Sequence, residues 1–174
     1  MQNNFKNLTL SILLILVCVS RLIPHPYNFS PVASIFLMAP LLLNDKRWSL
    51  TVSFIPLLIS DMLIGKFLYH SESLIYDGFI CVYFSYFMIW LFSHKLGSSK
   101  GFIINNLSGS LIFFLITNAG CWINNPMYSQ NIFGLFESYV AGIPFYWNTL
   151  AGIMFYSSIV YMMEKGISKI SFSN

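Results

Sequence analysis

The hydrophobic positions of this chain fall into six apolar segments separated by short polar stretches. Within each segment the apolar residues are nearly continuous instead of alternating with polar ones, a pattern that predicts helices rather than strands. The segments cover residues 7–20, 31–43, 48–64, 78–92, 102–122 and a last region within 139–163, most securely 148–163. The pattern therefore predicts an all-α protein.

The first three segments are shorter than the ~20 residues that a straight helix needs to cross the ~30 Å hydrocarbon layer of a bilayer. Pro40 lies inside the second segment, and Pro56 lies inside the third. Either polar neighbours extend these helices, or some of the helices are broken. Broken backbone at membrane depth is tolerated only where protein or a water-filled cavity satisfies its polar groups. The pattern therefore points to a cavity near the second and third segments.

Composition favours the membrane class. Of the 174 residues, 56% are hydrophobic and 9% are charged, whereas a soluble domain carries about 25% charged residues. So few charges would not cover the surface of a soluble fold of this size, and a surface that faces lipid needs none. We expect a single polytopic membrane domain over residues 1–174, with six transmembrane helices in contact with the lipid bilayer.

The basic residues are sorted along the chain as the positive-inside rule requires. With six spans and a cytoplasmic N-terminus, only Arg21 and Lys66 of the nine basic residues fall on the outer side. The cytoplasmic side holds Lys6, Lys46, Arg47, Lys95, Lys100, Lys165 and Lys169. Both termini are therefore predicted to be cytoplasmic. The net charge of +3 does not indicate a nucleic-acid partner.

Motifs for metal, cofactor or phosphate binding are missing from the sequence. The chain has no CxxC pair, no HExxH and no glycine-rich phosphate loop. We therefore expect no metal site and no cofactor. Cys18, Cys81 and Cys121 lie in or beside apolar segments, where buried free thiols are the ordinary outcome.

One polar stretch, RLIPHPYNFSP at residues 21–31, directly follows the first apolar segment. Its three prolines fix φ and remove backbone donors, so the stretch should be stiff and non-helical. Arg21 contributes a permanent cation, His25 a titratable ring and Asn28 an amide that donates and accepts. Two interpretations remain open: a helix–helix link whose arginine anchors to lipid headgroups, or a rigid polar rim over an outward-facing pocket.

Asp61 is a carboxylate inside the third apolar segment. It lies about 20 Å along a helix from Trp48, which corresponds to the outer part of the membrane. Intramembrane carboxylates are costly and usually face an internal partner or a cavity. The natural partner is Arg21 or Lys66. A structural ion pair and a carboxylate that contacts a substrate are both compatible with this position.

Further candidates lie at the outer ends of the last two segments. Asn118 could contact a solute or only a neighbouring helix, and Asn148 could contact a solute or cap its own helix. Trp122 and Tyr128 belong to a cluster of aromatic residues near the outer interface. Such residues form either an aromatic belt or a stacking platform for a flat ligand.

Four stretches of the chain together resemble an uncharacterised bacterial family of small six-helix membrane proteins. They are RLIPHPYNFSPVASIF, LLISDMLIG, LITNAGCW and MYSQNIFGLFESYVAGIPFYWNTLAG. The hallmark of that family is R-x-x-P-H-P-x-N-F-[ST]-P, then S-D in the third helix, T-N-x-G-x-W in the fifth and P-F-x-x-N-T-L-x-G at the sixth. The resemblance implies a polar signature at Arg21, His25, Asn28, Asp61, Asn118, Trp122 and Asn148.

That family is similar in size and layout to the substrate-binding S components of energy-coupling factor (ECF) vitamin transporters. The resemblance implies a protein of the bacterial inner membrane that takes up a vitamin, a cofactor precursor or a similar small solute. The chain departs from the pattern at Gly152-Ile153, where many relatives have Gly-Asp. Its first helix also lacks the Ala-x-x-x-Ala pattern by which S components dock on their transmembrane partner. Docking on an ECF-type energising module and transport without one are both open.

We expect a small-molecule solute to be captured between the proline-containing stretch and the outer ends of the third, fifth and sixth segments. Arg21 and Asp61 would set charge complementarity, and Trp122 and Tyr128 would close over the ligand. The hydrogen bonds would come from His25, Asn28, Asn118 and Asn148.

Two other functions compete with this expectation. In a structural or assembly subunit, Arg21 and Asp61 would only pair with each other. A membrane-embedded hydrolase could be built on Ser60, Asp61 and His25, but no nucleophile motif supports it. We therefore expect a protein that is not an enzyme.

Overall fold

The computed structural model describes residues 2–43, 45–67, 70, 78–93 and 99–172. Over this part of the chain it contains six α-helices, one short 3-10 helix and no strand. The elements are α1 (Gln2–Val19), η1 (Ser20–Leu22), α2 (Val32–Leu42), α3 (Lys46–Phe67), α4 (Phe79–Phe92), α5 (Ser99–Asn124) and α6 (Ile132–Phe172). The predicted all-α class and the predicted number of helices are confirmed.

The last helix is longer at both ends than the hydropathy pattern predicted, and a polar side chain caps its start. Asn131 Oδ1 accepts hydrogen bonds from the backbone N–H groups of Phe133 (3.0 Å) and Gly134 (3.1 Å), which satisfies two free donors of the first turn. α6 therefore begins at Ile132 and continues for 41 residues. Asp45 caps the start of α3 in the same way.

Prolines lie inside three helices without ending them: Pro40 in α2, Pro56 in α3 and Pro144 in α6. A broken third helix is therefore not observed, since α3 runs through Pro56 for 22 residues. The short element is α2, whose 11 residues rise only about 16 Å. The irregular backbone precedes α2, in residues 23–31, which we call the proline-rich loop.

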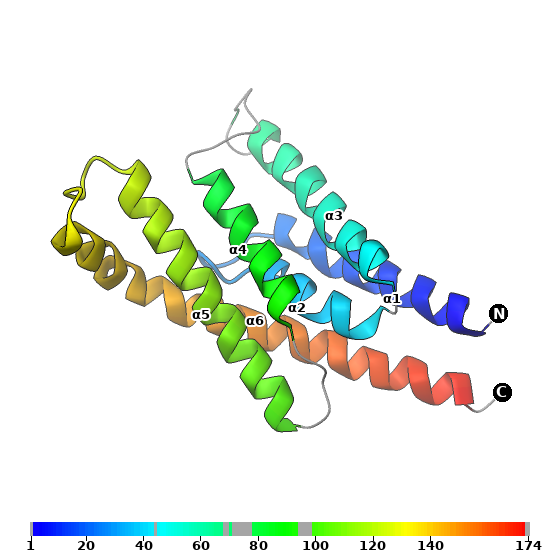
Figure 1. Cartoon of the computed structure of the whole chain (residues 1–174). Helices are drawn as coiled ribbons and strands as arrows, with labels where there is room; N and C mark the ends of the chain where they lie inside the picture. Colours follow the sequence, from blue (N-terminus) through cyan, green and yellow to red (C-terminus); the bar gives the residue numbers. More distant parts are fainter. Residues whose placement is uncertain (1, 44, 68–69, 71–77, 94–98, 173–174) are drawn as a thin grey trace.

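α2 forms the centre of the bundle. It contacts α1, α3, α4, α5 and α6, and residues 32–39 are all buried. The Phe36 ring stacks on Tyr86 of α4, with 5.2 Å between centroids, and meets Phe54 of α3 edge-on at 4.6 Å. Figure 1 shows both chain ends on one side of the bundle and the α5–α6 turn at the opposite end.

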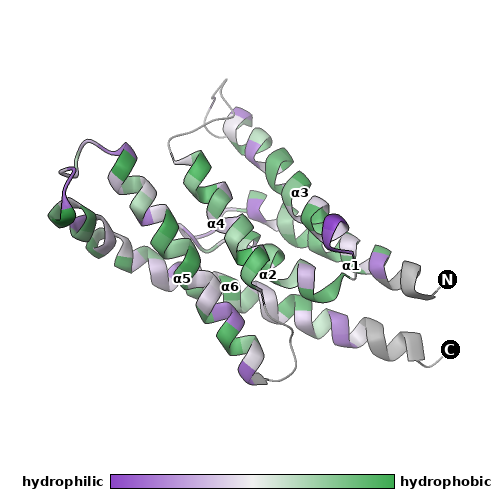
Figure 2. Cartoon of the chain, in the orientation of Figure 1, coloured by the Kyte–Doolittle hydropathy of each residue, from purple (hydrophilic) through white to green (hydrophobic). Residues whose placement is uncertain are grey.

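Hydrophobic residues predominate along the helices (green in Figure 2), and many large ones are exposed on the outside of the bundle. Leu16 of α1, Ile59 of α3 and Ile104 of α5 are among the large exposed hydrophobic residues. Two helices, Lys46–Phe67 and Lys100–Asn124, are long and apolar enough to cross a membrane. Shorter apolar helices cover Asn7–Leu22, Val32–Leu42 and Phe79–Phe92. Length and composition thus support two of the six predicted spans.

Candidate functional site

The proline-rich loop is docked on the middle of α6. Asn148 Nδ2 donates a hydrogen bond to the carbonyl oxygen of Tyr27 (3.1 Å). One turn further along, Gly152 allows the loop backbone to come close, since a Cβ there would lie 3.1 Å from Phe29 Cα. The Phe29 ring also packs against Phe155, with 5.7 Å between centroids. The loop is therefore a fixed part of the bundle.

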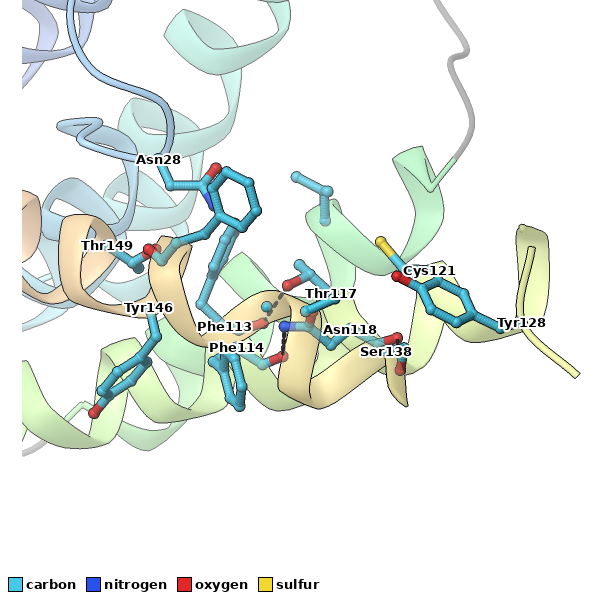
Figure 3. A pocket seen from close by; sticks show the side chains of 14 residues that line it. Asn28, Phe113, Phe114, Thr117, Asn118, Cys121, Tyr128, Ser138, Tyr146 and Thr149 are labelled. Carbon is cyan, nitrogen blue, oxygen red and sulfur yellow. Dashed lines mark hydrogen bonds between the residues drawn. The ribbon is translucent and has the colours of Figure 1, made fainter. Parts of the chain in front are cut away.

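This docking sets the position of Asn28. Its backbone has a φ of 63°, a left-handed conformation in which asparagine is enriched. The next residue closes the turn, because the N–H of Phe29 donates to the carbonyl oxygen of Pro26 (3.0 Å). As Figure 3 shows, the side-chain amide of Asn28 lies at a cavity beside α6.

The cavity has a volume of about 280 Å³ and lies between α5, α6, the start of α4 and two loops. Its amide and hydroxyl groups belong to Asn28, Thr117, Asn118, Ser138 and Thr149. Its aromatic groups belong to Phe113, Phe114, Tyr128, Phe145 and Tyr146. The rest of the wall consists of Val82, Cys121, Ala141 and Gly142. This volume is close to the lower end of the range for small-molecule pockets, about 300–1,000 Å³.

Hydrogen bonds to backbone carbonyls hold α5 and α6 together around the cavity. Ser138 Oγ donates to the carbonyl oxygen of Asn118 (3.2 Å), and the Tyr139 hydroxyl donates to that of Leu115 (2.9 Å). The Asn118 side chain donates through Nδ2 to the carbonyl one turn earlier (2.8 Å), which leaves Oδ1 as an acceptor. Gly142 makes room for this amide, because a Cβ there would collide with Asn118 Oδ1.

Arg21 and Asp61 form an ion pair that is not part of the cavity lining. Arg21 Nη1 donates to Asp61 Oδ1 (2.6 Å) and to Ser60 Oγ (3.0 Å). The second carboxylate oxygen accepts a hydrogen bond from the Tyr83 hydroxyl (2.6 Å). The network connects η1, α3 and α4. Asp61 is therefore paired with Arg21 and not with Lys66, the other predicted partner.

Of the residues predicted to bind a solute, the structure brings three to the cavity: Asn28, Asn118 and Tyr128. The others do not line it; they are Arg21, His25, Asp61, Trp122 and Asn148. The Trp122 indole N–H donates to the carbonyl of Ser129 (2.9 Å). His25 is exposed, with its Nδ1 3.0 Å from the carbonyl oxygen of Pro26.

The sequence interpretation missed most of the α6 wall. Ser138, Gly142, Phe145 and Thr149 are spaced by three or four residues, so they share one face of a helix. That spacing was the available signal. The hydropathy pattern defines the sixth segment most securely from residue 148 onwards, whereas α6 begins at Ile132, so most of this face lies before the secure part of the segment.

Other predicted features have mixed outcomes. Cys18 is buried, as expected, but Cys81 is only half-buried and Cys121 is exposed, so the prediction of three buried thiols is wrong. Ser60 Oγ donates to a backbone carbonyl of its own helix and shares no hydrogen bond with His25. Among the described residues, no group of three His, Cys, Asp or Glu side chains could hold a metal ion.

Comparison with known proteins identifies a family. Residues 1–170 match the model of a protein family described as a family of unknown function, DUF6580. The matched range includes every element that lines the cavity. No curated protein and no solved structure matches the chain. Since the match covers nearly all of its 174 residues, the chain belongs to the DUF6580 family.

Proposed function

We propose that this chain is a multi-pass membrane protein that captures a small solute from the outer face of the bilayer for uptake. The observation that carries the proposal is the cavity of about 280 Å³. Amide, hydroxyl and aromatic groups from α5, α6 and two loops converge on it, as is typical of small-molecule sites. Asn28, Asn118 and Tyr128 are both in its lining and among the residues expected to contact a solute.

Exposed apolar surface supports the membrane part of the proposal. Monomeric soluble proteins rarely expose contiguous apolar patches larger than a few hundred Å². Here large hydrophobic side chains are exposed on every α-helix except α2, which is enclosed by the others. A lipid environment accounts for such a surface without a protein partner on each face. Two helices meet the length criterion for crossing a membrane. The exposed apolar surface supports a membrane location for the other helices as well.

The distribution of basic residues supports an orientation with both termini in the cytoplasm of a bacterial cell. Lys46 and Arg47 begin α3, and Lys165 lies near the end of α6. α3 begins and α6 ends on the side of the bundle that holds both chain ends (Figure 1). Lys95 lies outside the described residues. In this orientation the α5–α6 turn and the cavity beside it face the outside.

The energy source for uptake would be either an ECF-type energising module or a reorientation of the bundle alone. Leu8, Ile12 and Leu16 form an exposed row of large side chains along α1. S components dock through small residues in this helix, so the row favours transport without such a module. Purification of the tagged chain from its native membrane, followed by identification of any ATPase subunits that accompany it, separates the two.

The alternative of an assembly subunit without a ligand is favoured by one observation. Arg21 and Asp61 bind each other at 2.6 Å, as that alternative expects, and neither lines the cavity. It predicts that filling the cavity has no consequence as long as the bundle folds.

Native mass spectrometry of the full chain, released from lipid nanodiscs, tests the proposal. We expect a bound small molecule with the unaltered chain and none with Ala141→Phe, because Ala141 lines the cavity and the larger side chain would fill it. Ala151→Phe is the matched control, since Ala151 is an exposed residue of the same helix that is not in the lining. No bound small molecule with the unaltered chain or with either variant would favour the assembly subunit, and equal retention in both variants would mean that the molecule binds outside this cavity.

A further inference from the structure

Among the described residues, the cavity offers no charged group to a ligand. None of the described lining residues is Asp, Glu, Lys, Arg or His. Glu137 precedes the lining residue Ser138 but is exposed and is not part of the wall. Arg21 and Asp61 are already paired with each other. A charged ligand would have to leave water without a counter-ion, which is strongly unfavourable.

The hydroxyl groups of the wall are committed as donors to their own helices. Thr117 Oγ1 donates to the carbonyl of Phe113 (2.8 Å), and Thr149 Oγ1 donates to that of Phe145 (3.0 Å). A hydroxyl has one proton, so each of these oxygens can only accept from a ligand. Ser138 is committed in the same way, since its Oγ donates to backbone carbonyls at 2.8 and 3.2 Å.

Acceptors therefore outnumber donors in the cavity. Asn118 adds a further acceptor, because one proton of its Nδ2 is used at 2.8 Å by its own helix and its Oδ1 remains. The groups that can still donate are the amide of Asn28, the second Nδ2 proton of Asn118, the weakly donating thiol of Cys121 and the phenols of Tyr128 and Tyr146. A ligand that satisfies this wall must bring several N–H or O–H groups of its own.

Aromatic rings form the remaining walls. Phe113 and Phe114 come from α5, whereas Phe145 and Tyr146 come from α6. Phe114 and Tyr146 meet edge-on, with 5.3 Å between centroids. Ring edges and faces arranged in this way pack best against a flat, polarisable body.

We infer that the cavity binds an uncharged, ring-containing solute that donates hydrogen bonds through N–H or O–H groups. The inference rests on the proposed function and specifies the chemical class of its ligand. It replaces the charge complementarity expected from Arg21 and Asp61 with recognition by neutral acceptors such as Asn118 Oδ1.

Cys121 provides the readout, because its thiol is exposed and lines the cavity. The full chain in nanodiscs is treated with N-ethylmaleimide, and the labelling rate at Cys121 is followed by peptide mass spectrometry, with Cys121→Ser as the control for assignment. Four probes of similar size are compared: benzamide, N,N-dimethylbenzamide, benzoate and benzylamine. A probe present at a concentration of about nine times its Kd should slow labelling about tenfold, because the fraction of protein without bound probe is 1/(1 + [L]/Kd).

We expect benzamide to protect the thiol and the other three probes to protect it several-fold less. Ala141→Phe should abolish the protection, and Ala151→Phe should retain it. Equal or stronger protection by benzoate or benzylamine overturns the uncharged class but leaves solute binding intact. Equal protection by N,N-dimethylbenzamide, which has no N–H, overturns the requirement for ligand donors. Protection by none of the probes overturns both the ligand class and the proposed capture of a solute.

Discussion

Removal of one member of the Arg21–Asp61 pair should destabilise the bundle strongly, whereas neutralising both members should not. Loss of one partner from a buried ion pair costs about 3–5 kcal/mol. The two side chains are 18% and 11% exposed, so we expect the lower end of that range, about 3 kcal/mol, for Arg21→Met. For a chain of this size 1 kcal/mol corresponds to about 2–4 °C, so the Tm should fall by about 6–12 °C.

Asp61→Asn should also destabilise the bundle, because Arg21 then keeps its charge without a counter-ion. In the double variant, Arg21→Met with Asp61→Asn, no buried charge remains. The amide oxygen of Asn at position 61 can still accept the hydrogen bond from Tyr83, which is now made at 2.6 Å. We therefore expect the double variant to lose only about 1 kcal/mol, which gives a coupling energy of several kcal/mol between the two positions.

Thermal unfolding in detergent, followed by tryptophan fluorescence, measures all of these variants. Lys66→Met is the control for loss of a cation from α3, since Lys66 is exposed; its effect should stay within about 0.5 kcal/mol. If the double variant lost as much stability as the sum of the two single variants, the pair would be uncoupled and the reasoning refuted. The folded double variant should also keep its protection by benzamide, because neither residue lines the cavity.

Three further predictions follow from individual contacts. Gly152→Val should lower the Tm and displace the bound solute, because even a Cβ would lie 3.1 Å from the backbone of the proline-rich loop. Gly166→Ala is the control, since an added Cβ there would have no atom within 4 Å. It should stabilise α6 by about 0.5–1 kcal/mol. Ser34→Ala should lower the free energy of unfolding by about 1 kcal/mol, measured by thermal unfolding, because the buried Ser34 Oγ donates to a carbonyl of α6 (3.1 Å). Ser157→Ala should be neutral or stabilising, because the buried Ser157 Oγ has no partner among the described residues. Thr117→Val removes an acceptor from the cavity and should weaken benzamide about 2- to 10-fold in the thiol-protection assay.

The sequence was sufficient to predict the helices but not their ends. Long apolar runs identify α1 to α5 to within a few residues, because burial and lipid contact both require continuous hydrophobic positions. The start of α6 was missed, because it depends on a single cap. Asn131 caps the helix at the end of the polar stretch 124–131, and Glu137 and Ser138 interrupt the short apolar run that follows it. Side-chain capping is a local hydrogen bond that the hydropathy of a segment does not report.

The candidate site was only partly predictable for a related reason. Polar residues in an apolar chain are conspicuous, so Asn28, Asn118 and Asp61 could all be selected from the sequence. The selection could not tell which of them face a cavity and which face each other. Arg21 and Asp61 are 40 positions apart, and their pairing depends on how η1 packs on α3, a relation between elements that the pattern within each element does not contain.

The proline-rich loop connects the short second helix with the candidate site. The 11 residues of α2 cover about half of a ~30 Å hydrocarbon layer, so in the proposed membrane orientation the loop occupies the remaining depth. Backbone polar groups at that depth need partners. The carbonyl of Tyr27 is satisfied by Asn148, that of Pro26 accepts the N–H of Phe29, and each proline removes a donor that would otherwise need one. The side chain that this arrangement leaves at the cavity is that of Asn28, so the same stretch that shortens the helix also provides a ligand-facing amide on a fixed backbone.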